Sequence, residues 1–121
     1  GLATDNKCVC VLKGACTLVA LPGGEVWINT RGNPGMASGG MGDVLTGVIA
    51  GFLAQGYSPE TAARLGVFLH SLAGDRVAET LGPVGFLASD VINALPGVMA
   101  GFLPAQTPRG WTCPPVTEQE P

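Results

Sequence analysis

A glycine-rich segment that runs directly into an apolar stretch is the part of this sequence best suited to chemistry. Residues 32–43 read Gly-Asn-Pro-Gly-Met-Ala-Ser-Gly-Gly-Met-Gly-Asp, and the apolar run 44–55 follows. A loop that opens a helix in this way leaves backbone N–H groups unpaired near the positive end of the helix dipole. Glycine also lets the backbone approach a ligand closely. The segment is therefore typical of a phosphate site, with Gly39, Gly40 and Met41 as its anion-binding part.

Asp43, the last residue of this loop, indicates a reaction rather than binding alone. A carboxylate repels the anion that the loop attracts, so a loop that only binds phosphate has no use for one. In phosphoryl transfer, however, a base must accept the proton of the attacking hydroxyl. An ordinary aspartate is ionised at pH 7, which is the state that a base requires. The alternative is that Asp43 merely caps the helix, a frequent role of aspartate.

Two common nucleotide-binding motifs are excluded. The loop contains no Gly-Lys-Ser or Gly-Lys-Thr, so it is not a Walker A loop. Gly40-Met41-Gly42 is followed by Asp-Val-Leu, so the third glycine of the dinucleotide-binding fingerprint is also missing.

The segment from residue 33 to residue 47, Asn-Pro-Gly-Met-Ala-Ser-Gly-Gly-Met-Gly-Asp-Val-Leu-Thr-Gly, resembles the signature of the ADP-dependent NAD(P)H-hydrate dehydratases, which belong to the ribokinase-like superfamily. Residues 11–17 are similar to that family's nucleotide-contacting strand and turn, and residues 69–75 and 85–90 match its later helices. The resemblance covers residues 8–98. It implies an α/β, ribokinase-like three-layer fold of which this chain is the C-terminal portion, with short strands, the loop, a buried helix and further helices.

The resemblance also implies a reaction and a role for individual residues. Asp43 would contact the substrate and act as the base. The substrate would be NADH or NADPH whose nicotinamide ring has gained water. ADP would phosphorylate the hydroxyl of this hydrate and become AMP, and phosphate would then leave to restore the ring, which makes the enzyme a lyase of nucleotide repair. Mg²⁺ would assist by offsetting charge, and an NAD(P)H-hydrate epimerase, fused or separate, would be a partner. The residues implied to contact the nucleotide are Lys13, Gly14, Ala15, Cys16, Thr17 and Gly42.

Other interpretations stay open at this point. An ATP-dependent kinase of the same superfamily, acting on a small molecule such as a vitamin precursor, would share the glycine-rich turn, although the Asn-Pro-Gly-Met opening argues against it. A non-catalytic, nucleotide-binding remnant is a third interpretation. Lys13 could simply reach solvent from the end of a strand. His70 lies in an apolar stretch and is interpreted as a core histidine with its hydrogen bonds satisfied, and Asp75 as a charge near a helix end.

Short strands precede the loop. Residues 8–12 predict a buried strand, and residues 17–21 and 25–29 predict two strands around a Pro-Gly-Gly turn. We expect no regular element over residues 30–42, because five glycines and a proline fall within that segment.

Helices follow the loop. Residues 44–55 are apolar on every side, which predicts a buried helix that ends at Gly56. Ser58 and Pro59 predict the cap and first residue of a second helix that extends to residue 80. A last helix is predicted over residues 89–95, where Pro-Gly would stop it.

The composition narrows the class of protein. Of 121 residues, 46% are apolar and 12% charged, about half the usual charged share. We therefore expect something else to cover part of this surface, and the family resemblance implies that this is the N-terminal half of a longer domain. On its own, the chain is expected to be inactive and to form a homo-oligomer. Residues 1–103 would form the C-terminal part of the domain, and residues 104–121 a flexible, proline-rich tail.

Charge and cysteine content exclude further classes. A net charge of −3 with six Lys and Arg offers no footprint for nucleic acid or an anionic membrane. The longest apolar stretch, residues 44–54, is shorter than the about 20 residues of a membrane-spanning helix. The four cysteines form no Cys-x-x-Cys pair and there is one histidine, so we expect no zinc site, reduced thiols and a cytoplasmic protein.

Overall fold

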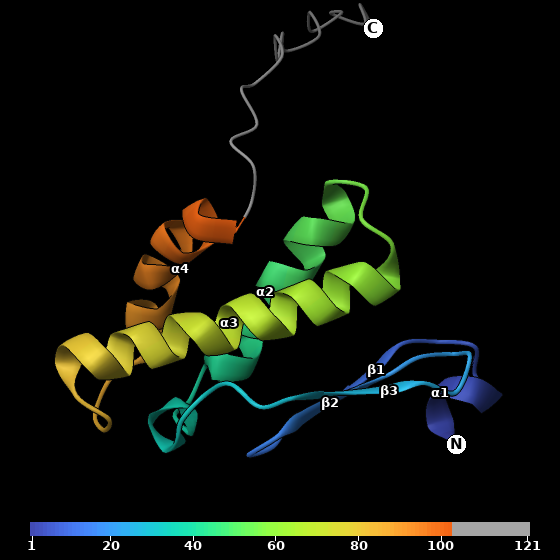
Figure 1. Cartoon of the computed structure of the whole chain (residues 1–121), viewed down its shortest axis with the longest axis horizontal. Coiled ribbons are helices and arrows are strands. Elements are labelled where there is room, and N and C mark those ends of the chain that lie inside the picture. Colours follow the sequence, from blue (N-terminus) through green and yellow to red (C-terminus); the bar gives the residue numbers. More distant parts are fainter. Residues whose placement is uncertain (103–121) are drawn as a thin grey trace, which may run out of the picture.

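The computed structural model describes residues 1–102, and the predicted tail over residues 104–121 lies outside this part. A three-stranded sheet carries three long helices on one of its sides (Figure 1). The elements in chain order are α1 (Leu2–Asp5), β1 (Cys10–Leu12), β2 (Thr17–Ala20), β3 (Val26–Asn29), a 3₁₀ turn (Pro34–Met36), α2 (Met41–Ala54), α3 (Pro59–Leu81) and α4 (Ala88–Phe102).

The sheet confirms the three predicted strands, but the prediction that the first of them is buried is wrong, because β1 has no buried residue and Leu12 is exposed. Its order is β1-β2-β3 and both pairings are antiparallel, with Val11 opposite Val19 and Val19 opposite Trp27. Because side chains alternate along a strand, these three residues share one face. Val19 is buried there against α2 and α3, and the guanidinium of Arg64 on α3 lies 3.7 Å from the centre of the Trp27 ring. The mixed helix-and-strand class is therefore as predicted.

α3 is the central element of the helical layer. It packs against the sheet, α2 and α4, and ten of its residues are buried, six of which are Gly, Ala or Ser. Small side chains let neighbouring segments approach closely. At Gly66, for example, an added Cβ would lie 2.6 Å from Cγ1 of Ile49 on α2. The sequence of α3 thus permits the tight packing of α2 that places the start of that helix.

The predicted stop of α2 at Gly56 is confirmed by its hydrogen bonds. Gly56 has φ +92°, and its N–H donates to the carbonyl of Leu53 at 3.0 Å. The next N–H, of Tyr57, donates to the carbonyl of Phe52 at 3.2 Å. This pair of bonds is the Schellman motif, and the Phe52 and Tyr57 rings meet edge to face at 5.3 Å. The predicted cap of α3 is also present, since the N–H of Thr61 donates to Ser58 Oγ at 3.2 Å.

The loop before α2 is more regular than predicted. A 3₁₀ turn forms at Pro34–Met36, because the Asn33 side chain accepts the N–H of Gly35 at 3.1 Å and proline fixes the backbone angle that follows. α2 begins at Met41 rather than after Asp43. Its N-cap is Gly40 with φ +86°, a left-handed conformation that glycine adopts without strain.

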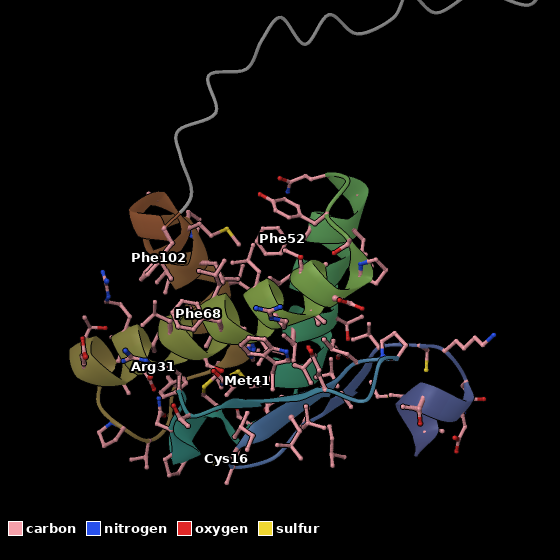
Figure 2. All side chains as sticks on the ribbon, turned by 45° about the vertical axis from the view of Figure 1, so that its right-hand side comes forward. Cys16, Arg31, Met41, Phe52, Phe68 and Phe102 are labelled. Atoms are coloured by element: carbon pink, nitrogen blue, oxygen red, sulfur yellow. The ribbon has the colours of Figure 1, made fainter. Side chains whose placement is uncertain are left out.

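The prediction that the last helix stops at Pro96 is wrong. α4 continues to Phe102 with Pro96 inside it. Proline removes one helical hydrogen bond, to the carbonyl of Ile92, and both residues are exposed, so water can satisfy that carbonyl. Packing beyond the proline favours the longer helix: Val98 is buried, and the Phe102 ring meets Phe68 of α3 edge to face at 5.5 Å (Figure 2).

Two apolar faces are uncovered within the described residues. α2, which is apolar on every side, is only partly covered: Met41, Leu45 and Phe52 are buried, and Leu53 is 43% exposed. On the sheet, the face away from the helices exposes Leu12 by 67%, Val26 by 55% and Ile28 by 63%. No helix within residues 1–102 is long and apolar enough to cross a membrane.

We predict that the 121-residue chain self-associates through the outer face of its sheet. Exposed apolar patches and open strand edges both favour association. Size-exclusion chromatography with light scattering should show species larger than a monomer, and the double variant Leu12→Lys, Ile28→Lys should shift them toward the monomer.

The matched control is Leu81→Lys with Val84→Lys, which changes exposed apolar residues away from the sheet and should leave association intact. A monomeric wild-type chain, or equal effects of the two double variants, would contradict this prediction.

Candidate functional site

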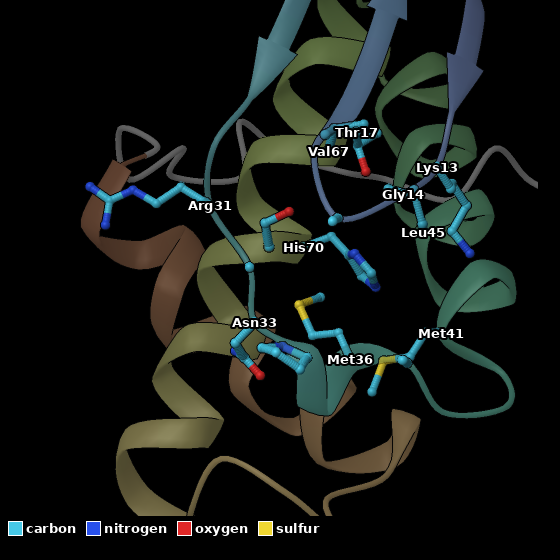
Figure 3. Close-up of a pocket in the computed structure, with 15 residues that line it drawn as sticks. Lys13, Gly14, Thr17, Arg31, Asn33, Met36, Met41, Leu45, Val67 and His70 are labelled. Carbon is cyan, nitrogen blue, oxygen red and sulfur yellow. The ribbon is translucent and has the colours of Figure 1, made fainter.

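A cavity of about 570 Å³ lies between the turn after β1, the glycine-rich loop and α3 (Figure 3). Its volume falls within the range usual for small-molecule sites. Part of the predicted site comes together in its lining, whereas Cys16, Gly39, Gly40 and Gly42 are not among the residues that line it. The predicted site residues that line this first cavity are Lys13, Gly14, Ala15, Thr17 and Met41.

Lys13 and Gly42 lie next to each other although they are 29 positions apart. A Cβ added to Gly42 would lie 2.6 Å from Nζ of Lys13, so the ammonium sits at the first turn of α2. The ammonium and the positive end of the helix dipole therefore act on the same point. The ion pair found within residues 1–102 joins the N-terminal ammonium to Asp5, which leaves Lys13 without a carboxylate partner there.

The first cavity is positively charged in a chain whose net charge is −3. Lys13 and Arg31 contribute to its lining, and no Asp or Glu of the described residues does. Figure 3 shows Arg31 at the rim, with its guanidinium pointing away from the middle of the cavity. Sequence reasoning missed Arg31, although its place directly before the glycine-rich loop was a usable signal. The charge distribution favours an anionic ligand.

α3 holds the loop in place through two side chains. The carboxylate of Asp75 accepts the N–H of Gly32 at 3.1 Å and the side-chain amide of Asn33 at 3.0 Å. Four residues earlier, Ser71 Oγ accepts the side-chain amide of Asn29 at 2.7 Å. The interpretation of Asp75 as a mere charge near the helix end is therefore wrong. Its partners lie more than 40 positions away, so only the three-dimensional packing reveals its role.

His70 is buried, as predicted, but its hydrogen bonds are not satisfied. It is 4% exposed, and its Nε2 has no hydrogen-bond partner among the described residues. Burial, and then the positive charge of Lys13, hold the pKa of His70 below its usual range, while the backbone of Met41 acts in the opposite direction. The imidazole is consequently neutral at pH 7.

Asp43 does not line the first cavity. It is exposed and belongs to a second cavity of about 600 Å³, which α2 and α4 line mainly with apolar residues. The alternative that Asp43 caps α2 is wrong, because the N-cap is Gly40 and Asp43 lies within the first helical turn. Gly42 and Asp43 thus face different sides of the helix start. Lys13 lies beside Gly42, and the exposed carboxylate of Asp43 lines the second cavity.

Comparison with known proteins assigns the family. The family model described as NAD(P)H-hydrate dehydratase matches residues 1–97. The chain belongs to the NAD(P)H-hydrate dehydratase family. It is 44% identical over 97 residues to the ADP-dependent (S)-NAD(P)H-hydrate dehydratase of Xanthomonas campestris, a match that spans 80% of this chain and 34% of that protein. It is 50% identical over 97 residues to the bifunctional NAD(P)H-hydrate repair enzyme Nnr of Moorella thermoacetica, covering 80% and 18% respectively.

The fold agrees with this family assignment. A crystal structure of the ADP/ATP-dependent NAD(P)H-hydrate dehydratase of Bacillus subtilis, co-crystallised with ATP and Mg²⁺, matches with a TM-score of 0.79 and 36% identity. The match covers 84% of this chain and 36% of that one. The predicted ribokinase-like architecture is therefore confirmed for a segment that spans about a third of the solved relative.

We predict that Gly42→Ala removes most of the rise in Tm that ADP gives to this chain. The new methyl group would displace the Lys13 ammonium from the start of α2, at a cost of about 1.5–3 kcal/mol if that ammonium bonds a phosphate. Without ADP, the variant should melt no lower than wild type, because alanine favours a helix over glycine by about 1 kcal/mol.

The matched control is Gly47→Ala on the same helix, where an added Cβ meets nothing within 4 Å. Differential scanning fluorimetry with saturating ADP measures all three proteins. An equal ADP response in both variants would contradict the placement of the phosphate.

Proposed function

We propose that this chain carries the nucleotide-binding part and the catalytic base of an ADP-dependent NAD(P)H-hydrate dehydratase. The observation that carries the proposal is the Lys13 ammonium beside Gly42 at the first turn of α2, in a cavity whose lining is cationic. The cationic lining suits the phosphates of ADP. Membership of the family connects this anion site to dehydration.

The reaction has two steps. The hydroxyl of the hydrated nicotinamide ring attacks the terminal phosphoryl group of ADP, its proton passes to Asp43, and AMP leaves. The C–O bond of the new phosphate ester then breaks, phosphate departs, and the loss of a ring proton restores the double bond. Lys13 and the N–H groups at the start of α2 stabilise the negative charge on the phosphoryl group in the first step.

The geometry at the helix start suits these two roles. Gly42 is next to the cation, and Asp43 is the following residue with an exposed carboxylate that lines the second cavity. A nucleotide bound beside Lys13 would leave Asp43 on the side from which an acceptor hydroxyl can approach. This separation removes the objection that a carboxylate repels the bound anion, because Asp43 does not line the first cavity.

The described residues do not fit a protein-held Mg²⁺ site. Within residues 1–102, no three His, Cys, Asp or Glu side chains lie together in a way that could hold a metal ion. Nucleotide-bound Mg²⁺ is usually held by phosphates, waters and only one or two carboxylates. Mg²⁺ therefore enters the proposal together with the nucleotide, and no step is assigned to it.

The names of the relatives favour dehydration over the alternative of a vitamin-precursor kinase. The chain spans 18% of the bifunctional relative. We therefore also propose that another part of the protein supplies the remainder of the active site, and that an NAD(P)H-hydrate epimerase is its partner. In this proposal, residues 1–103 form the C-terminal part of the dehydratase domain. The free thiols of Cys8, Cys10 and Cys16 are consistent with a cytoplasmic enzyme.

We predict that Asp43→Asn lowers turnover by about 10²- to 10⁴-fold, the usual contribution of a general base. The assay mixes the chain and the N-terminal half of a dehydratase domain with hydrated NADH and ADP, and follows the return of NADH absorbance. ADP affinity and Tm should change little, because Asp43 does not line the first cavity.

Glu60→Gln is the matched control, since Glu60 is also an exposed carboxylate in the first turn of a helix. It should retain full turnover. If Asp43→Asn keeps its activity, or loses only as much as the control, Asp43 is not the base.

A further inference from the structure

One face of α3 presents Gly66, His70 and Gly74, which are spaced four residues apart and therefore follow one another along the helix. α2 approaches at Gly66 through Ile49, and the loop approaches at Gly74 through Met36. The imidazole between these contacts lies in the first cavity (Figure 3). The two glycines thus allow α2 and the loop to pack on α3, and the His70 side chain lies between these two contacts.

His70 has one ring nitrogen that no group of the described residues satisfies. Its Nε2 is buried and without a partner among residues 1–102, and the side chains of Met36, Leu45 and Val67 that line the same cavity offer no strong donor or acceptor. An unsatisfied buried nitrogen destabilises a fold, so a position of this kind calls for an explanation. A polar atom of a bound ligand would supply the missing hydrogen bond.

We propose that Nε2 of His70 forms a hydrogen bond with the sugar–phosphate part of the adenine nucleotide bound in the first cavity. This inference rests on the proposed function. Lys13, which fixes the phosphates in that proposal, lines the same cavity as His70, so His70 faces the portion of the nucleotide next to the phosphates. Because the imidazole is neutral at pH 7, it acts through a hydrogen bond rather than through charge.

The proposed hydrogen bond predicts different effects of His70 on ADP affinity and on stability. A histidine with a purely structural role would stabilise the folded protein and leave ADP affinity alone. A histidine whose nitrogen is satisfied only by a bound ligand should strengthen ADP binding and add no stability to the protein without ADP. His70→Phe, which removes both nitrogens and keeps an aromatic ring, should therefore leave the Tm without ADP unchanged or higher. His70→Gln, whose amide reaches about as far as Nε2, should recover most of the lost affinity.

The experiment is isothermal titration of the 121-residue chain and both variants with ADP. His70→Phe should bind ADP about three- to tenfold more weakly, as expected for one lost hydrogen bond. Nitrogen-15 NMR of the wild-type chain provides a second readout, because the sequence contains one histidine. Its imidazole nitrogen signals should shift when ADP is added and stay unchanged when inorganic sulfate is added at the same ionic strength.

Each outcome decides between the two proposals. If the wild-type chain does not bind ADP, the proposed function fails and this inference fails with it. If the wild type binds ADP but the imidazole signals do not move, or if His70→Phe binds equally well, the role of His70 is overturned while the proposed function stands. A variant that melts lower and keeps its affinity identifies a structural histidine.

Discussion

The close approach of the glycine-rich loop to one face of α3 is the constraint on which the site depends. At Gly74 an added Cβ would overlap the side chain of Met36, so glycine lets this side chain of the loop pack directly on α3. The carboxylate of Asp75 then fixes the loop by accepting hydrogen bonds from Gly32 and Asn33. With its loop fixed to α3 and its helix packed on Gly66, the start of α2 has one position relative to the sheet. That position brings Gly42 to Lys13.

Charge is then divided between two sides of the same helix start. Lys13 and Arg31 make the first cavity cationic in an acidic chain, and Asp43 is exposed toward the second cavity. A phosphoryl-transfer enzyme needs both a cation for the phosphates and a base for the acceptor, and these groups neutralise each other if they form an ion pair. Lys13 lies beside Gly42, whereas Asp43, the next residue in the same helical turn, lines the second cavity, and this arrangement avoids the ion pair. Because only 12% of the residues are charged, few other charges act on Lys13, Arg31 and Asp43.

Sequence reasoning succeeded where local rules decide the structure. The Pro-Gly-Gly turn, the stop of α2 at Gly56 and the cap at Ser58 each depend on a few neighbouring residues, and all three are present. It failed where distant packing decides. α4 passes through Pro96 because Val98 and Phe102 are held by the core and by α3.

The candidate site follows the same division. The loop pattern and the family resemblance of residues 13–17 predicted a nucleotide site, and half of the predicted site residues line one cavity. Asp75 and His70 were assigned structural roles, because nothing nearby in the sequence reveals that Asp75 holds a loop more than 40 positions away or that Nε2 of His70 has no partner within residues 1–102. The uncovered faces of α2 and the sheet agree with the expectation, based on the low share of charged residues, that something else covers part of this surface.

In the proposed function, the first cavity binds ADP with its phosphates on Lys13. The most direct measurement is the Kd of ADP for the wild-type chain, Lys13→Gln and the control Lys7→Gln, by isothermal titration calorimetry. Lys7 is exposed and does not line the cavity. We expect Lys13→Gln to bind about 10- to 100-fold more weakly, the value of a charge-assisted hydrogen bond, and Lys7→Gln to bind like wild type. Equal affinities of the two variants would contradict the claim.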